Sequence, residues 1–125
     1  MIKDRKITSH RDLIVWQKAM DLVNLIYALS RNFPESERFG LLSQMRRSAV
    51  SVPSNIAEGR VRKTTKDFLQ FLHVASGSTA ELETQVDIAF RQRFIQKADY
   101  NKAMALLSEV GKMLVSLISS LNAKL

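Results

Sequence analysis

The basic side chains of this 125-residue chain are concentrated in one stretch. Between Arg38 and Lys66 there are seven Lys or Arg residues and one acidic residue, Glu58, whereas the rest of the chain has twelve basic and eleven acidic residues. Most of the net charge of +7 therefore comes from this stretch. Clustered guanidinium and ammonium groups can bind the phosphates of a nucleic acid. The candidates for such contacts are Arg46, Arg47, Arg60, Arg62, Lys63 and Lys66.

The same cations also have structural interpretations. Basic residues near the end of a helix complement its dipole and stabilise it by about 0.3–1 kcal/mol each. One of the two adjacent arginines, Arg46 or Arg47, could form an ion pair while the other faces solvent. The partner would be Glu58 or Glu83. The aromatic residues fall on apolar helix faces, which favours core packing over base stacking; they are Trp16, Phe68, Phe71 and Phe90.

The residue types that carry catalysis do not form a recognisable constellation. Cysteine is absent, which excludes thiolate nucleophiles and cysteine-ligated zinc. Neither His10 nor His73 has a glutamate three positions earlier, so the Glu-x-x-His pattern of a di-metal bundle is missing. The four glycines are isolated, which does not indicate a phosphate-cradling loop. We therefore expect a protein that is not an enzyme and that uses no metal or cofactor.

Helices are expected to position these residues. The chain is 46% hydrophobic, which is enough for the core of one domain spanning residues 1–125. Two prolines and four glycines are too few for the frequent turns of a β protein, and apolar residues recur at helical spacing. The sequence predicts an all-α fold with four helices, over about residues 11–32, 37–60, 65–93 and 99–122. A basic N-terminal arm, residues 1–11, comes before the first helix.

Capping patterns indicate where these helices begin. The segments 9–12 and 64–67 have the S/T-x-x-D pattern, in which side-chain oxygens accept hydrogen bonds from unpaired backbone N–H groups. Ser36 and Asp99 are the expected caps of the second and fourth helices. Pro53 lies inside the second helix among small residues, which favours a kinked helix that packs closely on a neighbour; a break that shapes a binding surface is the alternative.

Short connections between long helices favour antiparallel neighbours, so we predict an antiparallel up-down-up-down four-helix bundle. In that topology the link between the second and third helices lies at the same end as the N-terminus. This end would gather two sets of cations: Lys3, Arg5, Lys6 and Arg11 from the start of the chain, and Arg60, Arg62, Lys63 and Lys66 from the link.

The first and last helices are more apolar than a single bundle requires. On a helical wheel the apolar residues of the first helix fill roughly 200°, against about 100° needed to face one core. We therefore expect homo-oligomerisation, in which further copies of the chain cover this surface. The alternative is that the first helix is buried on both sides within one subunit. The interface candidates are Val15, Ala19, Leu22, Ile26, Leu29, Met104 and Val115.

Hydropathy does not indicate a membrane partner. No segment reaches the roughly 18 uninterrupted apolar residues of a membrane span. The basic N-terminus is not followed by the apolar stretch and cleavage site of a signal peptide. We therefore expect a cytoplasmic protein.

Several segments resemble one bacterial family. They are Val15-Trp16-Gln17-Lys18-Ala19, Phe39-Gly40-Leu41, residues 43–49, residues 81–85 and, most distinctively, Val52-Pro53-Ser54-Asn55-Ile56-Ala57-Glu58-Gly59. Together they are similar to the four-helix-bundle proteins first described from intervening sequences of 23S ribosomal RNA genes, often labelled ribosomal proteins. The accessory variability determinant of diversity-generating retroelements is a related protein. The resemblance covers about residues 12–121.

The resemblance implies a homopentameric ring, a basic surface that binds RNA or DNA and, from the retroelement relative, a reverse transcriptase as partner. It also makes Asn55 and Glu58 motif residues, and the chain departs from the family pattern at Val61, where a small residue such as glycine is expected. The leading hypothesis is a non-enzymatic, ring-forming bundle that binds structured nucleic acid. The alternative is a protein-binding adaptor or scaffold that docks an acidic partner or a reverse transcriptase.

Overall fold

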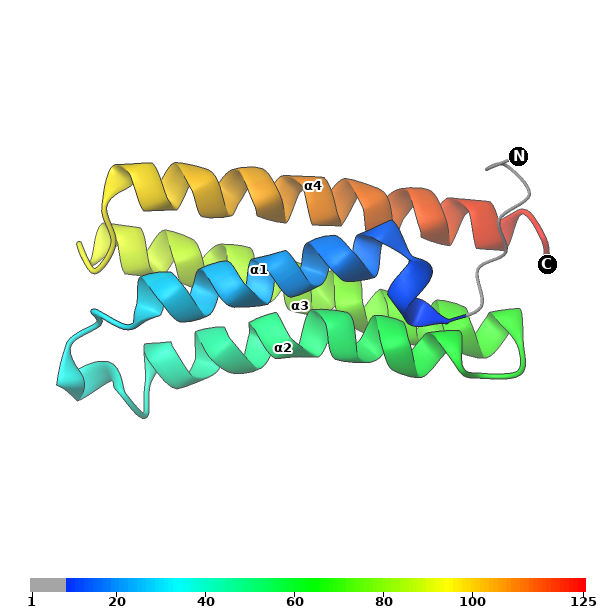
Figure 1. The fold of residues 1–125 in the computed structure, drawn as a ribbon, viewed down its shortest axis with the longest axis horizontal. Coiled ribbons are helices and arrows are strands. Elements are labelled where there is room, and N and C mark those ends of the chain that lie inside the picture. The colour runs from blue at the N-terminus through cyan, green and yellow to red at the C-terminus, as the bar shows by residue number, and fades with distance from the viewer. Residues whose placement is uncertain (1–8) are drawn as a thin grey trace.

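The structure, a computed structural model, describes residues 9–125 as four α-helices and two short 3-10 turns. They are, in chain order, η2 (His10–Asp12), α1 (Ile14–Ser30), η3 (Glu35–Glu37), α2 (Leu41–Arg60), α3 (Thr65–Arg91) and α4 (Lys97–Asn122). The helices run alternately up and down along one long axis, and each packs on two others (Figure 1). The predicted all-α, up-down-up-down bundle is confirmed. Residues 1–8 of the predicted N-terminal arm lie outside the described residues.

The core runs the length of the bundle between the four helices. Each helix contributes buried apolar residues at spacings of three and four, which places them on one face. The largest fully buried side chains include Leu22, Ile26, Met45, Ile56, Leu72, Leu82, Leu107 and Leu114. Burying one side chain of this size contributes about 1.5–3 kcal/mol, so packing rather than intrinsic helix propensity stabilises the helices.

Helix α1 is buried more completely than predicted. Five residues expected at an interface between copies are 0–8% exposed in the core of a single subunit: Val15, Ala19, Leu22, Ile26 and Leu29. That prediction was wrong because these residues form the middle of the apolar arc, and α1 packs on both α2 and α4 of its own chain. Two exposed apolar residues of α1, Met20 and Tyr27, lie toward one margin of the arc, and a third, Ile14, lies outside it.

Helix α4 is strongly apolar, and outside its buried stripe it has half-buried apolar residues and one exposed large apolar residue, Val115. Among the described residues it is the one helix long and apolar enough to cross a membrane, and 17% of its most apolar window is buried. Helix α4 packs its buried stripe on α1 and α3. Two predicted interface residues lie on α4 outside this stripe: Met104 is half-buried and Val115 is 66% exposed.

Two predicted capping patterns form. The Oγ of Ser9 accepts a backbone N–H at 3.1 Å, and Asp12 Oδ2 accepts the N–H of Ser9 at 3.2 Å. This pair caps η2 rather than α1, because Leu13 is extended and α1 begins after it. At the start of α3, the Oγ1 of Thr64 accepts the N–H of Asp67 at 3.1 Å, as predicted.

The other two predicted caps are wrong. Ser36 lies within η3, and α2 begins later, at Leu41. The N–H of Leu41 donates a hydrogen bond to Glu37 Oε1 at 3.1 Å, so a glutamate side chain pairs with a backbone N–H at the start of α2. Helix α4 begins at Lys97, which places Asp99 in its first turn, where the carboxylate complements the helix dipole.

Helix α2 continues through the buried Pro53 and then packs closely on α3. The two helices lie close together at Gly59, where an added Cβ would lie 2.8 Å from the Cβ of Phe71 and 2.9 Å from Cδ1 of Phe68. The link after α2 does not require a small residue. Val61 has φ −85° and ψ −5°, in a region that any L-residue can adopt.

Candidate nucleic-acid interface

The predicted cations occupy two separate surfaces. One set lies at the α2–α3 link, at the end of the bundle where α1 begins (Figure 1). Arg46 and Arg47 lie nearer the other end of α2. Arg46 precedes Arg60 by fourteen residues, which corresponds to about 21 Å along a helix at 1.5 Å per residue. Residues predicted as a single set therefore cannot all contact one phosphate group.

The cations at the α2–α3 link, which we call the link end, are Arg11, Arg60, Arg62, Lys63 and Lys66. Arg62 Nη2 forms an ion pair with Glu58 Oε2 at 2.6 Å, and its guanidinium lies 4.8 Å from the ring centroid of Phe71. Lys63 and Lys66 are exposed. The link end therefore has exposed charge, but one of its arginines is neutralised locally. Three residues predicted to join it lie outside the described residues: Lys3, Arg5 and Lys6.

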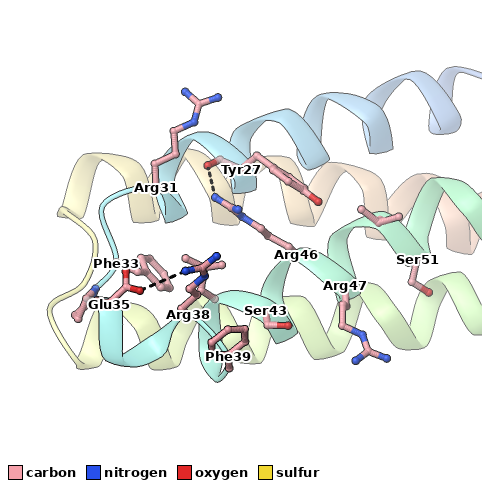
Figure 2. A pocket seen from close by; sticks show the side chains of 13 residues that line it. Tyr27, Arg31, Phe33, Glu35, Arg38, Phe39, Ser43, Arg46, Arg47 and Ser51 are labelled. Carbon is pink, nitrogen blue, oxygen red and sulfur yellow. Dashed lines mark hydrogen bonds and ion pairs between the residues drawn. The ribbon is translucent and has the colours of Figure 1, made fainter.

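A hollow of about 790 Å³ opens where α1 ends and α2 begins (Figure 2). Four arginines and a single carboxylate line it: Arg31, Arg38, Arg46, Arg47 and Glu35. The rest of its wall is formed by Tyr27, Phe33, Pro34, Phe39, Leu42, Ser43, Val50 and Ser51. We call this surface the arginine hollow. A concave surface lined by charge of one sign concentrates the electrostatic potential, so it favours an anionic ligand.

Arg46 is fixed in the wall of the hollow by groups on α1. Its Nε donates to the Oγ of Ser30 at 3.0 Å, and its Nη2 donates to the carbonyl oxygen of Tyr27 at 3.3 Å. The guanidinium also lies 4.5 Å from the ring centroid of Tyr27. The predicted ion pair with Glu58 or Glu83 is not formed, because Glu58 pairs within the link end and Glu83 faces a groove beside α4. Arg46 therefore has a structural role as well as a charge.

Arg47 points away from Arg46 and toward α3 (Figure 2). Consecutive residues on a helix differ by about 100° in direction, which separates the two side chains. Arg47 is exposed and forms no ion pair with any of residues 9–125. Arg47 faces solvent, as predicted for one of the two arginines, but the predicted ion pair of the other is replaced by the hydrogen bonds of Arg46 to α1.

The rim of the hollow has an exposed aromatic ring. Phe39 is 88% exposed, and the guanidinium of Arg38 lies 5.3 Å from its ring centroid. Arg38 also contacts Glu35 at 3.6 Å, but both side chains are mostly exposed, and such pairs contribute little free energy. Arg38 can therefore exchange this partner for a phosphate. An exposed ring beside an arginine is also a surface on which a nucleobase can stack.

Sequence reasoning missed three residues of the hollow. Arg31 and Arg38 were not among the predicted site residues, and Phe39 was not predicted to be exposed. The exposure of Phe39 could have been predicted from its position in the chain. It precedes Gly40 in the connection between two helices, where the chain turns outside the bundle. Arg31 follows Tyr27 by four residues, so both lie on the same side of the last turn of α1.

Metal-binding and proton-transfer groups do not gather at the hollow. Within residues 9–125, no three His, Asp or Glu side chains are close enough together to hold a metal ion. The pKa of Tyr100 is raised, chiefly because its hydroxyl donates a hydrogen bond to Asp87 Oδ1 at 2.6 Å. Neither member of this pair lines the hollow. This hydrogen bond joins α3 to α4, so the raised pKa reflects a structural contact.

Comparison with known proteins identifies the family. A family model described as 23S rRNA-intervening sequence protein matches residues 11–116. A solved protein of unknown function from the S23 ribosomal protein family of Bacteroides thetaiotaomicron has a similar fold, with a TM-score of 0.79 and 25% sequence identity. That similarity covers 85% of this chain and 96% of the other. No curated protein matches the chain. The match over most of its length shows that this chain belongs to the 23S rRNA-intervening sequence protein family.

Proposed function

We propose that the protein binds structured nucleic acid through phosphate contacts in the arginine hollow and that it does not catalyse a reaction. The observation that supports this proposal most strongly is the composition of the hollow, whose lining has four arginines and one carboxylate. Guanidinium groups donate paired hydrogen bonds that fit phosphate oxygens. The family description names an RNA, so RNA is the first nucleic acid to test, with DNA beside it.

The link end would supply a second set of phosphate contacts. Lys63 and Lys66 are exposed there. The hollow and the link end are joined by the single continuous helix α2, so their separation is fixed by the fold. A nucleic acid long enough to contact both should therefore bind more tightly than one that reaches only the hollow.

The test is the salt dependence of RNA binding, measured by fluorescence anisotropy with a labelled hairpin. Arg31→Gln and Arg47→Gln remove charge from the hollow without removing the hydrogen bonds of Arg46. Each should reduce the slope of log affinity against log salt by about 1. Lys102→Gln removes one charge from an exposed site on α4 and is the matched control. A slope that the hollow variants and the control change equally would contradict phosphate binding at the hollow.

The second candidate function is a protein-binding adaptor that docks an acidic partner or a reverse transcriptase. A groove of about 350 Å³ between α1 and α2 favours it, because most of its lining is apolar: Trp16, Met20, Val23, Val50, Pro53 and Ala57, with His10 and Ser54. Apolar surface of this kind fits a protein partner better than a phosphate. If neither RNA nor DNA binds at micromolar protein concentration, the adaptor becomes the preferred function.

We further propose that copies of the chain associate through the outer face of α4, in the homopentamer implied by the family resemblance. Val115 is 66% exposed and lines a groove of about 450 Å³ between α3 and α4. A Cβ added at Gly111 in this groove would have no neighbour within 4 Å. Light scattering on the wild type and on Val115→Asp tests the proposal, with dissociation expected for the variant. A wild-type protein that is monomeric at all concentrations would contradict it.

A further inference from the structure

A second, smaller cavity lies between α2 and α3, beside the arginine hollow. Its volume is about 340 Å³, and every residue that lines it is polar: Gln44, Arg47, Ser48, Ser51, Ser78, Glu81 and Gln85. We call it the polar slot. It shares Arg47 and Ser51 with the arginine hollow, so the two cavities adjoin. Figure 2 shows the side chains of Arg47 and Ser51 both directed away from Arg46.

The polar slot contains a buried acceptor without a partner. Gln85 is 6% exposed, and its Oε1 accepts no hydrogen bond from any of the described residues. Buried polar atoms are nearly always hydrogen-bonded, because an unpaired one has lost its contacts with water. Because this oxygen is itself buried from solvent, it lies beneath the floor of the slot and not on the open surface that a ligand would contact.

The serines of the slot are already paired within the protein. The hydroxyls of Ser51 and Ser78 lie 2.7 Å apart, and the Oγ of Ser48 donates to Glu81 Oε1 at 3.3 Å. Four groups remain for a ligand. The carboxylate of Glu81 offers acceptor oxygens, the guanidinium of Arg47 offers donors, and Gln44 and Gln85 have side-chain amides.

We propose that the polar slot binds an unstacked guanine base of the RNA. Guanine has two neighbouring donors, N1–H and the 2-amino group, which one carboxylate such as that of Glu81 can accept together. Its O6 and N7 are acceptors, the pair that arginine recognises most often. Adenine, cytosine and uracil each present a single donor group, so they would leave acceptors of the slot unpaired.

The position of the slot suits a base whose flanking phosphates lie in the arginine hollow. Bases in RNA loops and bulges are unstacked and can be recognised at their edges. A cavity of about 340 Å³ is within the size range of small-ligand pockets. The inference rests on the proposed function and adds a base preference to it: the protein should favour RNA loops that present a guanine.

The test compares short RNA hairpins that differ in one loop base, measured with the same protein at one salt concentration. The guanine hairpin should bind about tenfold more tightly than the adenine hairpin or the inosine hairpin, which lacks the 2-amino group. Glu81→Gln should abolish this preference, because an amide cannot accept both donors. Glu81 is exposed, so the variant should fold normally. Since the preference is a ratio of two affinities, the general effect of removing a negative charge cancels.

Asp21→Asn is the matched control, because it removes the same charge from an exposed position on α1 that lines neither the polar slot nor the arginine hollow. It should keep the preference for guanine. Equal affinity for the three hairpins would overturn the base slot while leaving phosphate binding intact, and so would a preference that survives in Glu81→Gln. Failure of every hairpin to bind would overturn both the slot and the proposed function.

Discussion

Replacing Gly59 with alanine should destabilise the protein, even though alanine is the better helix former. Gly59 lies in the last turn of α2, where the helix is in close contact with α3. The new Cβ would lie 2.8 Å from the Cβ of Phe71, 2.9 Å from Cδ1 of Phe68 and 3.2 Å from the carbonyl oxygen of Phe68. Non-bonded carbon atoms prefer separations of about 3.5–4.0 Å.

Two of these neighbours cannot move away by rotating a side chain. The Cβ of Phe71 and the carbonyl oxygen of Phe68 are fixed to the backbone of α3, so α2 and α3 would have to separate locally. Overpacking of this kind costs about 1–3 kcal/mol. Alanine recovers about 1 kcal/mol through its higher helix propensity. The free energy of unfolding should therefore fall, by up to about 2 kcal/mol.

Equilibrium urea unfolding at a fixed protein concentration, followed by circular dichroism, measures this change. Gly77→Ala is the matched control, because Gly77 lies within α3 and an added Cβ there would have no neighbour within 4 Å. The control should gain about 0.5–1 kcal/mol. If Gly59→Ala gains as much as Gly77→Ala, the close approach of α2 and α3 is refuted.

Two further predictions concern polar contacts between helices. Arg46→Ala should lower the free energy of unfolding by about 1–3 kcal/mol, because it removes two hydrogen bonds between α2 and α1 and leaves the buried hydroxyl of Ser30 with only its 3.4 Å bond to the carbonyl oxygen of Tyr27. Arg47→Ala should change the free energy of unfolding by less than about 0.5 kcal/mol. If urea unfolding shows that the two variants lose the same stability, the structural role of Arg46 and the solvent-facing position of Arg47 are contradicted. The raised pKa of Tyr100 means that its contribution to stability is present below pH 10 and is lost as the pH rises through the raised value. Asp87→Asn should lower the pKa of Tyr100, which ultraviolet titration of tyrosinate measures. If the pKa does not change in this variant, the hydrogen bond to Asp87 is not the cause of the raised pKa.

The fold could be predicted from the sequence because its signals are local and repeated. Four long segments with apolar residues at spacings of three and four specify four helices, and short links specify antiparallel neighbours. The exact ends of the helices were harder to predict than their existence. Thr64 was identified correctly because its partner lies three residues away, whereas the side chain that satisfies the start of α2 belongs to Glu37, in a turn that no periodicity marks.

The predicted site was less accurate because it depends on contacts between segments far apart in the chain. A helical wheel shows how wide an apolar arc is, but not which part the subunit's own helices cover, and this is why Leu22 and Ile26 were misplaced at an interface. Charge spacing suggested a carboxylate partner for Arg46, but its partners are a hydroxyl and a carbonyl on α1. The polar slot exists only where α2 packs on α3, so no local pattern predicts it.

Arginine footprinting with phenylglyoxal is the most direct test of phosphate binding in the arginine hollow. The protein is modified with and without a saturating RNA hairpin, and the modified arginines are located by mass spectrometry. Arg31, Arg38 and Arg47 should be protected by the RNA, while Arg91, which does not line the hollow, should stay reactive. Unchanged reactivity of the hollow arginines under conditions where the RNA is bound would show that its phosphates lie elsewhere.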